Sequence, residues 1–301
     1  MAEKDPFKRD WAVVQVPYGG GFSSLNISKP KGTRYAPKAL RKEFMRQRIF
    51  MADNGVSSWD DIIWHNIDLG ISRQNCISGW ERMHRKVFER SELLFGEAKN
   101  VLFLGGSHTM TASTFPALSQ DRRHHTGLIV LDAHPDCCRK SPYWPVHSDW
   151  LRWLVEDNSV FPENVLIIGL RQIEPQENKF LNKYGIKYYL MDSIKPGDNL
   201  VKNDVSMFLA LEKLCKLSAI YLSIDIDVAS GVYTPGTGCP SPGGFTDIEL
   251  VNLVKQLKAA LPNLKAVDIV EIDPLNWWRK HILRYDPTID LGVKLIKEII
   301  S

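Results

Sequence analysis

The chain has 301 residues, of which 44% are hydrophobic and 24% charged, and its formal net charge is +3. This composition is typical of a soluble globular protein with a large core, and we expect a single domain over residues 1–301. Because the lysines and arginines are scattered and no apolar stretch is long enough to span a bilayer, we expect no nucleic-acid partner and no membrane.

The five cysteines lack CxxC spacing, and the first residues have no apolar core of a signal peptide. An odd number of cysteines without such spacing fits free thiols in a reducing compartment. We therefore expect a cytoplasmic protein.

Short apolar runs recur along the chain and are continuous rather than alternating. Continuous runs are typical of strands that are buried on both faces, as in parallel sheets. In chain order the predicted strands are residues 11–16, 101–104, 128–131, 165–168, 188–190, 220–222 and 266–270.

Helical patterns lie between these runs. Pro37 suits the first turn of one helix, and Thr246 with Glu249 forms a capping box ahead of another. Asp286 and Pro287 open a final helix. The alternation of strand and helix predicts a three-layer α/β/α fold with a central, mostly parallel sheet. Ligands in such folds bind beyond the carboxyl ends of the strands.

Hard ligands follow three of the apolar runs directly. They are His108, then Asp132, His134 and Asp136, then Asp225 and Asp227. A lone pair of alternating aspartates is usually a solvated turn, but uncompensated carboxylates at buried strand ends are costly, and a cation is the simplest remedy. Residues two apart in an extended segment point the same way, so we expect Asp132, His134 and Asp136 to share one face. The set predicts two divalent cations side by side, which indicates a hydrolase.

These ligands belong to a longer series of motifs. In order they are Gly105-Gly106-Ser107-His108, Asp132-Ala133-His134-Pro135-Asp136, Ser223-Ile224-Asp225-Ile226-Asp227, Thr234-Pro235-Gly236-Thr237-Gly238-Cys239-Pro240, Gly243-Gly244 and Glu271-Ile272-Asp273-Pro274. In order and spacing they resemble the motifs of the arginase, or ureohydrolase, superfamily, which includes arginase, agmatinase, guanidinobutyrase and formiminoglutamase. The resemblance extends from about Val13 to the C-terminus.

The resemblance implies an arginase-like fold that binds two Mn²⁺ ions, with Ni²⁺ as an alternative for these ligand types. The implied ligands of the first ion are His108, Asp132, Asp136 and Asp225. Those of the second ion are His134, Asp132, Asp225 and Asp227, so that Asp132 and Asp225 bridge the pair.

The resemblance also implies which residues act in catalysis. His147 lies near the position of the family's proton-shuttling histidine, a role that suits a pKa near neutrality; the alternative is a surface-loop histidine. Glu271 matches the carboxylate that binds the substrate's guanidinium group. Asp136, a metal ligand, is the third residue that we count as catalytic.

The substrate-binding positions match the family only in part. Cys138 falls where arginases carry an asparagine that reads the α-carboxylate, and Cys239 replaces a threonine near the guanidinium. Glu174 and Glu177 match acidic positions that read the α-amino group, whereas Ser107 replaces the usual aspartate before His108. Because a thiol is a poor partner for a carboxylate, Cys138 weighs against a strict arginase. The predicted substrate-binding residues are Glu271, Glu174, Glu177, Cys138 and Cys239.

We therefore expect a hydrolase that cleaves a C–N bond of a linear guanidino or amidino compound, agmatine- or arginine-like, to urea and an amine. The alternatives are a formiminoglutamase-type hydrolase that releases formamide, a non-catalytic homologue, and a deacetylase-like enzyme with one metal ion. The partner is a small-molecule substrate. The resemblance also implies a homo-oligomer, a trimer or hexamer.

Overall fold

The computed structural model describes residues 11–20, 31–52, 64–69, 77–97, 100–120, 125–194, 204–278 and 286–301. Within these ranges the strands form one eight-stranded sheet of order β2-β1-β3-β8-β7-β4-β5-β6, and every neighbouring pair is parallel. The strands are β1 (Trp11–Gln15), β2 (Trp64–Asn66), β3 (Asn100–Leu104), β4 (Thr126–Leu131), β5 (Val165–Leu170), β6 (Lys187–Leu190), β7 (Ala219–Asp225) and β8 (Leu264–Val270).

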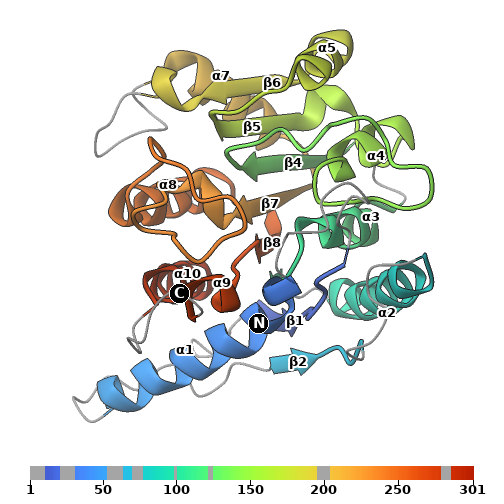
Figure 1. Ribbon diagram of the computed structural model, residues 1–301. Helices are drawn as coiled ribbons and strands as arrows, with labels where there is room; N and C mark the ends of the chain where they lie inside the picture. The colour runs from blue at the N-terminus through green and yellow to red at the C-terminus, as the bar shows by residue number, and fades with distance from the viewer. Residues whose placement is uncertain are drawn as a thin grey trace, which may run out of the picture.

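Helices cover both faces of this sheet (Figure 1). One core contains side chains of α1 (Ala36–Ala52), α7 (Val205–Leu214), α8 (Asp247–Ala260) and α10 (Pro287–Ile300). The other contains side chains of α2 (Ile77–Gly96), α3 (Thr111–Ser119), α4 (Trp150–Glu156) and α5 (Pro175–Tyr184). The short helix α9 (Pro274–Trp278) follows β8. Alternate residues of β4 divide between the two cores, with Ile129 in the first and Val130 in the second.

The predicted three-layer α/β/α fold is therefore confirmed. Each predicted strand is present, and Thr246 and Glu249 form the expected capping box at the start of α8. The Asp286 carboxylate caps α10 by accepting from the amides of Thr288 and Ile289. No helix in the described ranges has the length and apolar character that crossing a membrane requires.

The topology places the candidate site. Strands β3, β8, β7, β4 and β5 are consecutive in the sheet, and all run in the same direction. Their carboxyl ends therefore meet at one edge. His108 follows β3, Glu271 follows β8, Asp225 ends β7 and Asp132 follows β4. Residues that are up to 163 positions apart in the chain are thereby brought together.

Candidate metal centre

A close approach of backbone segments positions His108. A Cβ on Gly106 would overlap the carbonyl oxygen of Tyr18, so only glycine permits the contact there. The same carbonyl accepts from the Ser107 amide at 2.7 Å. The Gly106 carbonyl accepts from the Glu271 amide at 2.8 Å, and Glu271 Oε1 accepts from the His108 amide at 2.8 Å. The turn after β3 is thus fixed against the segment after β8.

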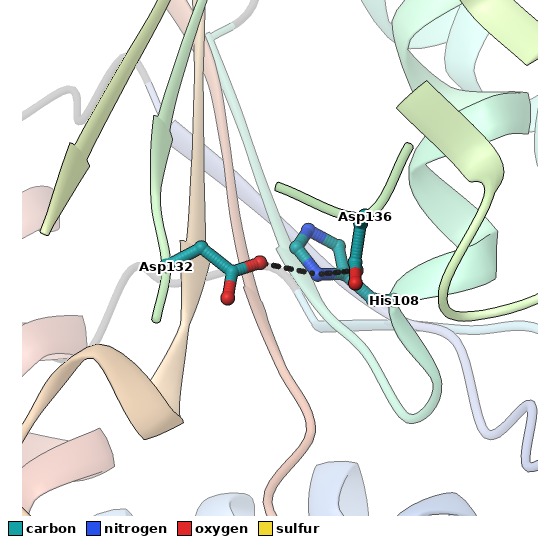
Figure 2. A group of neighbouring side chains, drawn as sticks. All are labelled: His108, Asp132 and Asp136. Carbon is teal, nitrogen blue, oxygen red and sulfur yellow. Dashed lines mark ion pairs between the residues drawn. The ribbon is translucent and has the colours of Figure 1, made fainter. Parts of the chain in front are cut away.

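Three carboxylates approach one nitrogen of the His108 ring. Its Nδ1 lies 3.2 Å from Asp132 Oδ2, 3.1 Å from Asp136 Oδ2 and 3.2 Å from Asp225 Oδ2. Figure 2 shows two of these carboxylates reaching the ring from different segments. His108 Nδ1 and Asp132 Oδ2 are nevertheless buried without a hydrogen-bond partner among the described residues. One proton on Nδ1 cannot satisfy three carboxylates, whereas a cation between these atoms would.

A buried chain of hydrogen bonds orients the other side of the ring. His108 Nε2 lies 2.9 Å from Ser223 Oγ, and Ser223 Oγ donates to Asp268 Oδ1 at 2.7 Å. Asp268 is fully buried and also accepts from the hydroxyls of Thr111 and Tyr221 at 2.7 and 2.8 Å. Because Ser223 donates to Asp268, it accepts from His108 Nε2–H, which leaves Nδ1 as the ligand nitrogen.

Asp268 is not among the site residues predicted from the sequence. The available signal was a carboxylate inside the apolar run 266–270, which was predicted as a buried strand. A charged residue in such a strand requires partners, and here three hydroxyl groups supply them.

A second group of candidate ligands contains Asp132, His134 and Asp227. His134 Nδ1 lies 3.1 Å from Asp227 Oδ2 and 3.6 Å from Asp132 Oδ1. Asp225 Oδ1 accepts from the Asp227 amide at 2.9 Å, which links the last residue of β7 to the turn that follows it. The first group contains His108, Asp132 and Asp136, so Asp132 belongs to both groups.

Asp132, His134 and Asp136, which the sequence predicts to share one face, divide between the two groups. Asp136 lies with His108, whereas His134 lies with Asp227. The segment is not extended, and Asp136 has a positive φ of 49° that redirects its side chain. Glu271 also has a positive φ, 60°, and such backbone conformations in non-glycine residues cluster at functional sites.

The carboxylates perturb one another strongly. Burial and then the charge of Asp132 raise the pKa of Asp136 to about 7. Burial, followed by the charges of Asp227 and Asp132, raises the pKa of Asp225 well above its usual value. Ionisation of all four aspartates would give more negative charge than the two histidines can offset, and a bound cation would relieve this repulsion.

A cavity of about 1230 Å³ opens over this cluster. Its walls include all the remaining predicted site residues, namely His147, Glu271, Glu174, Glu177, Cys138 and Cys239. The candidate metal ligands, the predicted proton shuttle and the predicted substrate-binding side chains thus surround one space.

Two of the predicted substrate-binding residues have structural contacts in the described chain. Glu177 is buried, and its oxygens accept from the amides of Cys137 at 3.2 Å and Glu174 at 3.0 Å. Glu174 Oε2 accepts from the Gln176 side chain at 2.8 Å. Burial raises the pKa of the Cys138 thiol, which keeps it protonated near neutral pH. Contact of these side chains with a substrate stays a prediction.

Comparisons with known proteins agree with this arrangement. The family model described as "Arginase family" matches residues 9–301. Formimidoylglutamase of Bacillus subtilis is 24% identical over 87% of this chain and 79% of that protein. Arginase of Staphylococcus aureus is 26% identical over 89% and 91%, and guanidinopropionase of Pseudomonas aeruginosa is 27% identical over 90% and 81%.

Solved structures match the fold. The crystal structure of formimidoylglutamase from Bacillus subtilis superposes with a TM-score of 0.78 at 22% identity, and covers 96% of this chain and 85% of that one. Arginase from the same organism gives a TM-score of 0.76 at 23% identity, with 97% and 98% covered.

The fold and the comparisons define a hydrolase that acts on the C–N bonds of linear amidines, which confirms the enzyme class that the sequence predicts. The chain belongs to the arginase family.

Proposed function

We propose that this protein is a binuclear manganese hydrolase that cleaves a linear guanidino compound to urea and an amine. The observation that carries the proposal is the pair of candidate ligand groups that share Asp132, with His108 Nδ1 and Asp132 Oδ2 buried and unpartnered among the described residues. The matches to an arginase and a guanidinopropionase support a guanidino substrate.

The residues present fit two divalent ions. Carboxylate oxygens and imidazole nitrogens suit manganese, and nickel is the alternative. His108 and Asp136 would hold one ion, His134 and Asp227 the other, and Asp132 and Asp225 would bridge them. Bound divalent ions would lower the pKa of water and so supply hydroxide at neutral pH.

The remaining roles belong to the cavity walls. Glu271 would bind the planar guanidinium through charge-assisted hydrogen bonds, held in place by its contact with the His108 amide at 2.8 Å. His147 is 8% exposed and lines the same cavity, from which its imidazole would give a proton to the departing amine.

The part of the substrate distant from the guanidinium group is less constrained by the structure than that group. Cys138 in the cavity wall offers no strong donor for a carboxylate, which favours agmatine-like compounds over arginine. A formimino substrate is the second candidate, because a formimidoylglutamase is among the relatives that match the chain. A non-catalytic homologue is disfavoured, since all six expected ligand positions carry the expected residue types. The trimer or hexamer and the cytoplasmic location stay predictions.

The test is a substrate panel with the Mn²⁺-loaded protein. Arginine, agmatine, guanidinobutyrate, guanidinopropionate and formiminoglutamate would each be incubated, and urea and formamide measured. Release of urea from one guanidino compound supports the proposal. If formiminoglutamate is the only compound cleaved, and formamide the product, the formimino substrate replaces the guanidino substrate as the supported hypothesis. No product from any compound, with two ions bound, would contradict both.

A further inference from the structure

The second ligand group is assembled from two segments that are far apart in the chain. Asp132 and His134 lie in the loop after β4, and Asp227 lies in the turn Ile226–Val228 after β7. A direct bond between the segments runs from the Ala133 amide to Asp227 Oδ1, and at 3.3 Å it is long. The separation of His134 and Asp227 therefore depends on further contacts.

Arg171, the first residue after β5, contacts both segments. Its backbone amide donates to the carbonyl of Ala133 at 2.9 Å. Ala133 lies between the candidate ligands Asp132 and His134 in the loop after β4. Its guanidinium donates to the carbonyl oxygens of Asp227 at 2.6 Å and Val228 at 2.8 Å. The same side chain donates to Ser241 Oγ at 3.1 Å, so the following loop is held as well.

The local sequence explains why Arg171 reaches this position. Gly169 has a φ of 101°, and the pairing of β5 with β6 is irregular between Ile168 and Leu170. A Cβ on Gly169 would lie 2.5 Å from Val228 Cγ2, so glycine permits the end of β5 to approach the β7 turn. A guanidinium presents fixed parallel donors and bonds adjacent carbonyl groups together, which a lysine ammonium cannot reproduce.

A different residue supports the first group. The indole N–H of Trp150 donates to Asp136 Oδ2 at 2.8 Å. The Trp150 ring also packs on His108, with the ring centroids 4.5 Å apart. No hydrogen bond of the Arg171 side chain among those described reaches His108 or Asp136.

We propose that Arg171 is a positioning residue of the second metal ion, as Trp150 is of the first; this inference rests on the proposed function. The Arg171 guanidinium acts through the Asp227 turn, whereas the backbone contact with Ala133 is kept in every side-chain variant. Loss of its guanidinium should therefore weaken the binding of the second ion more than that of the first.

The test compares Arg171→Met with Trp150→Phe, each of which keeps much of the side-chain volume. Mn²⁺ would be titrated calorimetrically into metal-free protein, and the two sequential dissociation constants compared with wild type. We expect Arg171→Met to lower the affinity for the second ion about 10- to 100-fold and to change the affinity for the first by less than about threefold. Trp150→Phe should weaken the binding of the first ion. The magnetic coupling of an ion pair, seen by electron paramagnetic resonance at two equivalents of Mn²⁺, should be lost in Arg171→Met.

Arg171→Lys is the second variant, and it tests the proposal if circular dichroism shows that Arg171→Met is unfolded. It keeps the positive charge but not the fork of donors, so we expect the second ion to remain weakened. Wild-type binding of both ions by Arg171→Lys, or an unchanged ratio of the two constants in Arg171→Met, would overturn this inference alone. A wild-type protein that binds fewer than two ions would overturn the proposed function and this inference with it.

Discussion

Replacing Ser223 with alanine tests how the core prepares His108 to bind a metal ion. An ionised carboxylate only accepts hydrogen bonds, so Ser223 Oγ must donate to Asp268 Oδ1 across 2.7 Å. It must then accept from His108 Nε2–H at 2.9 Å. Ser223→Ala removes both bonds and leaves the ring free to carry its proton on Nδ1, the nitrogen that faces the carboxylates.

The structure sets the size of the effect. Loss of a hydrogen bond to a buried carboxylate should lower the free energy of unfolding by about 1.5–3 kcal/mol. Loss of the orienting partner of a ligand histidine should weaken Mn²⁺ binding about 10- to 100-fold. Urea denaturation of the metal-free protein measures the first quantity, and calorimetric titration with Mn²⁺ measures the second.

Tyr221→Phe is the matched control. The Tyr221 hydroxyl donates to Asp268 Oδ2 at 2.8 Å and to no atom of His108 among the bonds described. Tyr221→Phe should lower the free energy of unfolding by an amount similar to Ser223→Ala, while its Mn²⁺ affinity stays within about twofold of wild type. Equal losses of affinity in the two variants, or none in Ser223→Ala, would refute the reasoning.

Three further predictions concern the site itself. Asp132→Ala removes the residue common to both ligand groups, so bound metal and turnover should be lost together; a metal-free variant with full turnover would contradict the mechanism. His147→Ala should lower kcat more than it changes KM, and a normal kcat would assign the proton shuttle elsewhere. The pKa of Asp136 is raised to about 7, so below pH 7 its proton must leave before an ion binds. Despite burial, hydrogen bonds to the neighbouring carboxylates also raise the pKa values of His108 and His134, so their protons must leave as well. Mn²⁺ affinity should therefore fall as the pH is lowered from 8 to 6, which calorimetry would measure, and pH-independent binding would refute this.

The fold and the location of the site follow from local sequence signals. Continuous apolar runs such as 128–131 mark strands buried on both faces, and parallel strands bring their carboxyl ends to one edge. The candidate ligands after those runs therefore lie close together. The strand β2 (Trp64–Asn66) escaped prediction because it is three residues long, lies at the sheet edge and includes polar His65.

The arrangement within the site depends on contacts that no local pattern encodes. Asp136 has a positive φ, which alternation of residue types does not reveal. The roles of Arg171 and Trp150 come from hydrogen bonds that cross from one strand end to another. Asp268 was detectable in principle, as a carboxylate in a buried strand, but its partners Thr111 and Tyr221 are visible only in the folded chain.

The most direct test of the central claim is to count Mn²⁺ ions per chain while measuring the rate of urea release from a guanidino substrate. Metal-free protein would be loaded in steps, and bound manganese determined by mass spectrometry at each step. We expect saturation at two ions per chain, with urea release that rises as the second ion binds and is lost on chelation. Saturation at one ion with full activity, or urea release by the metal-free protein, would contradict it.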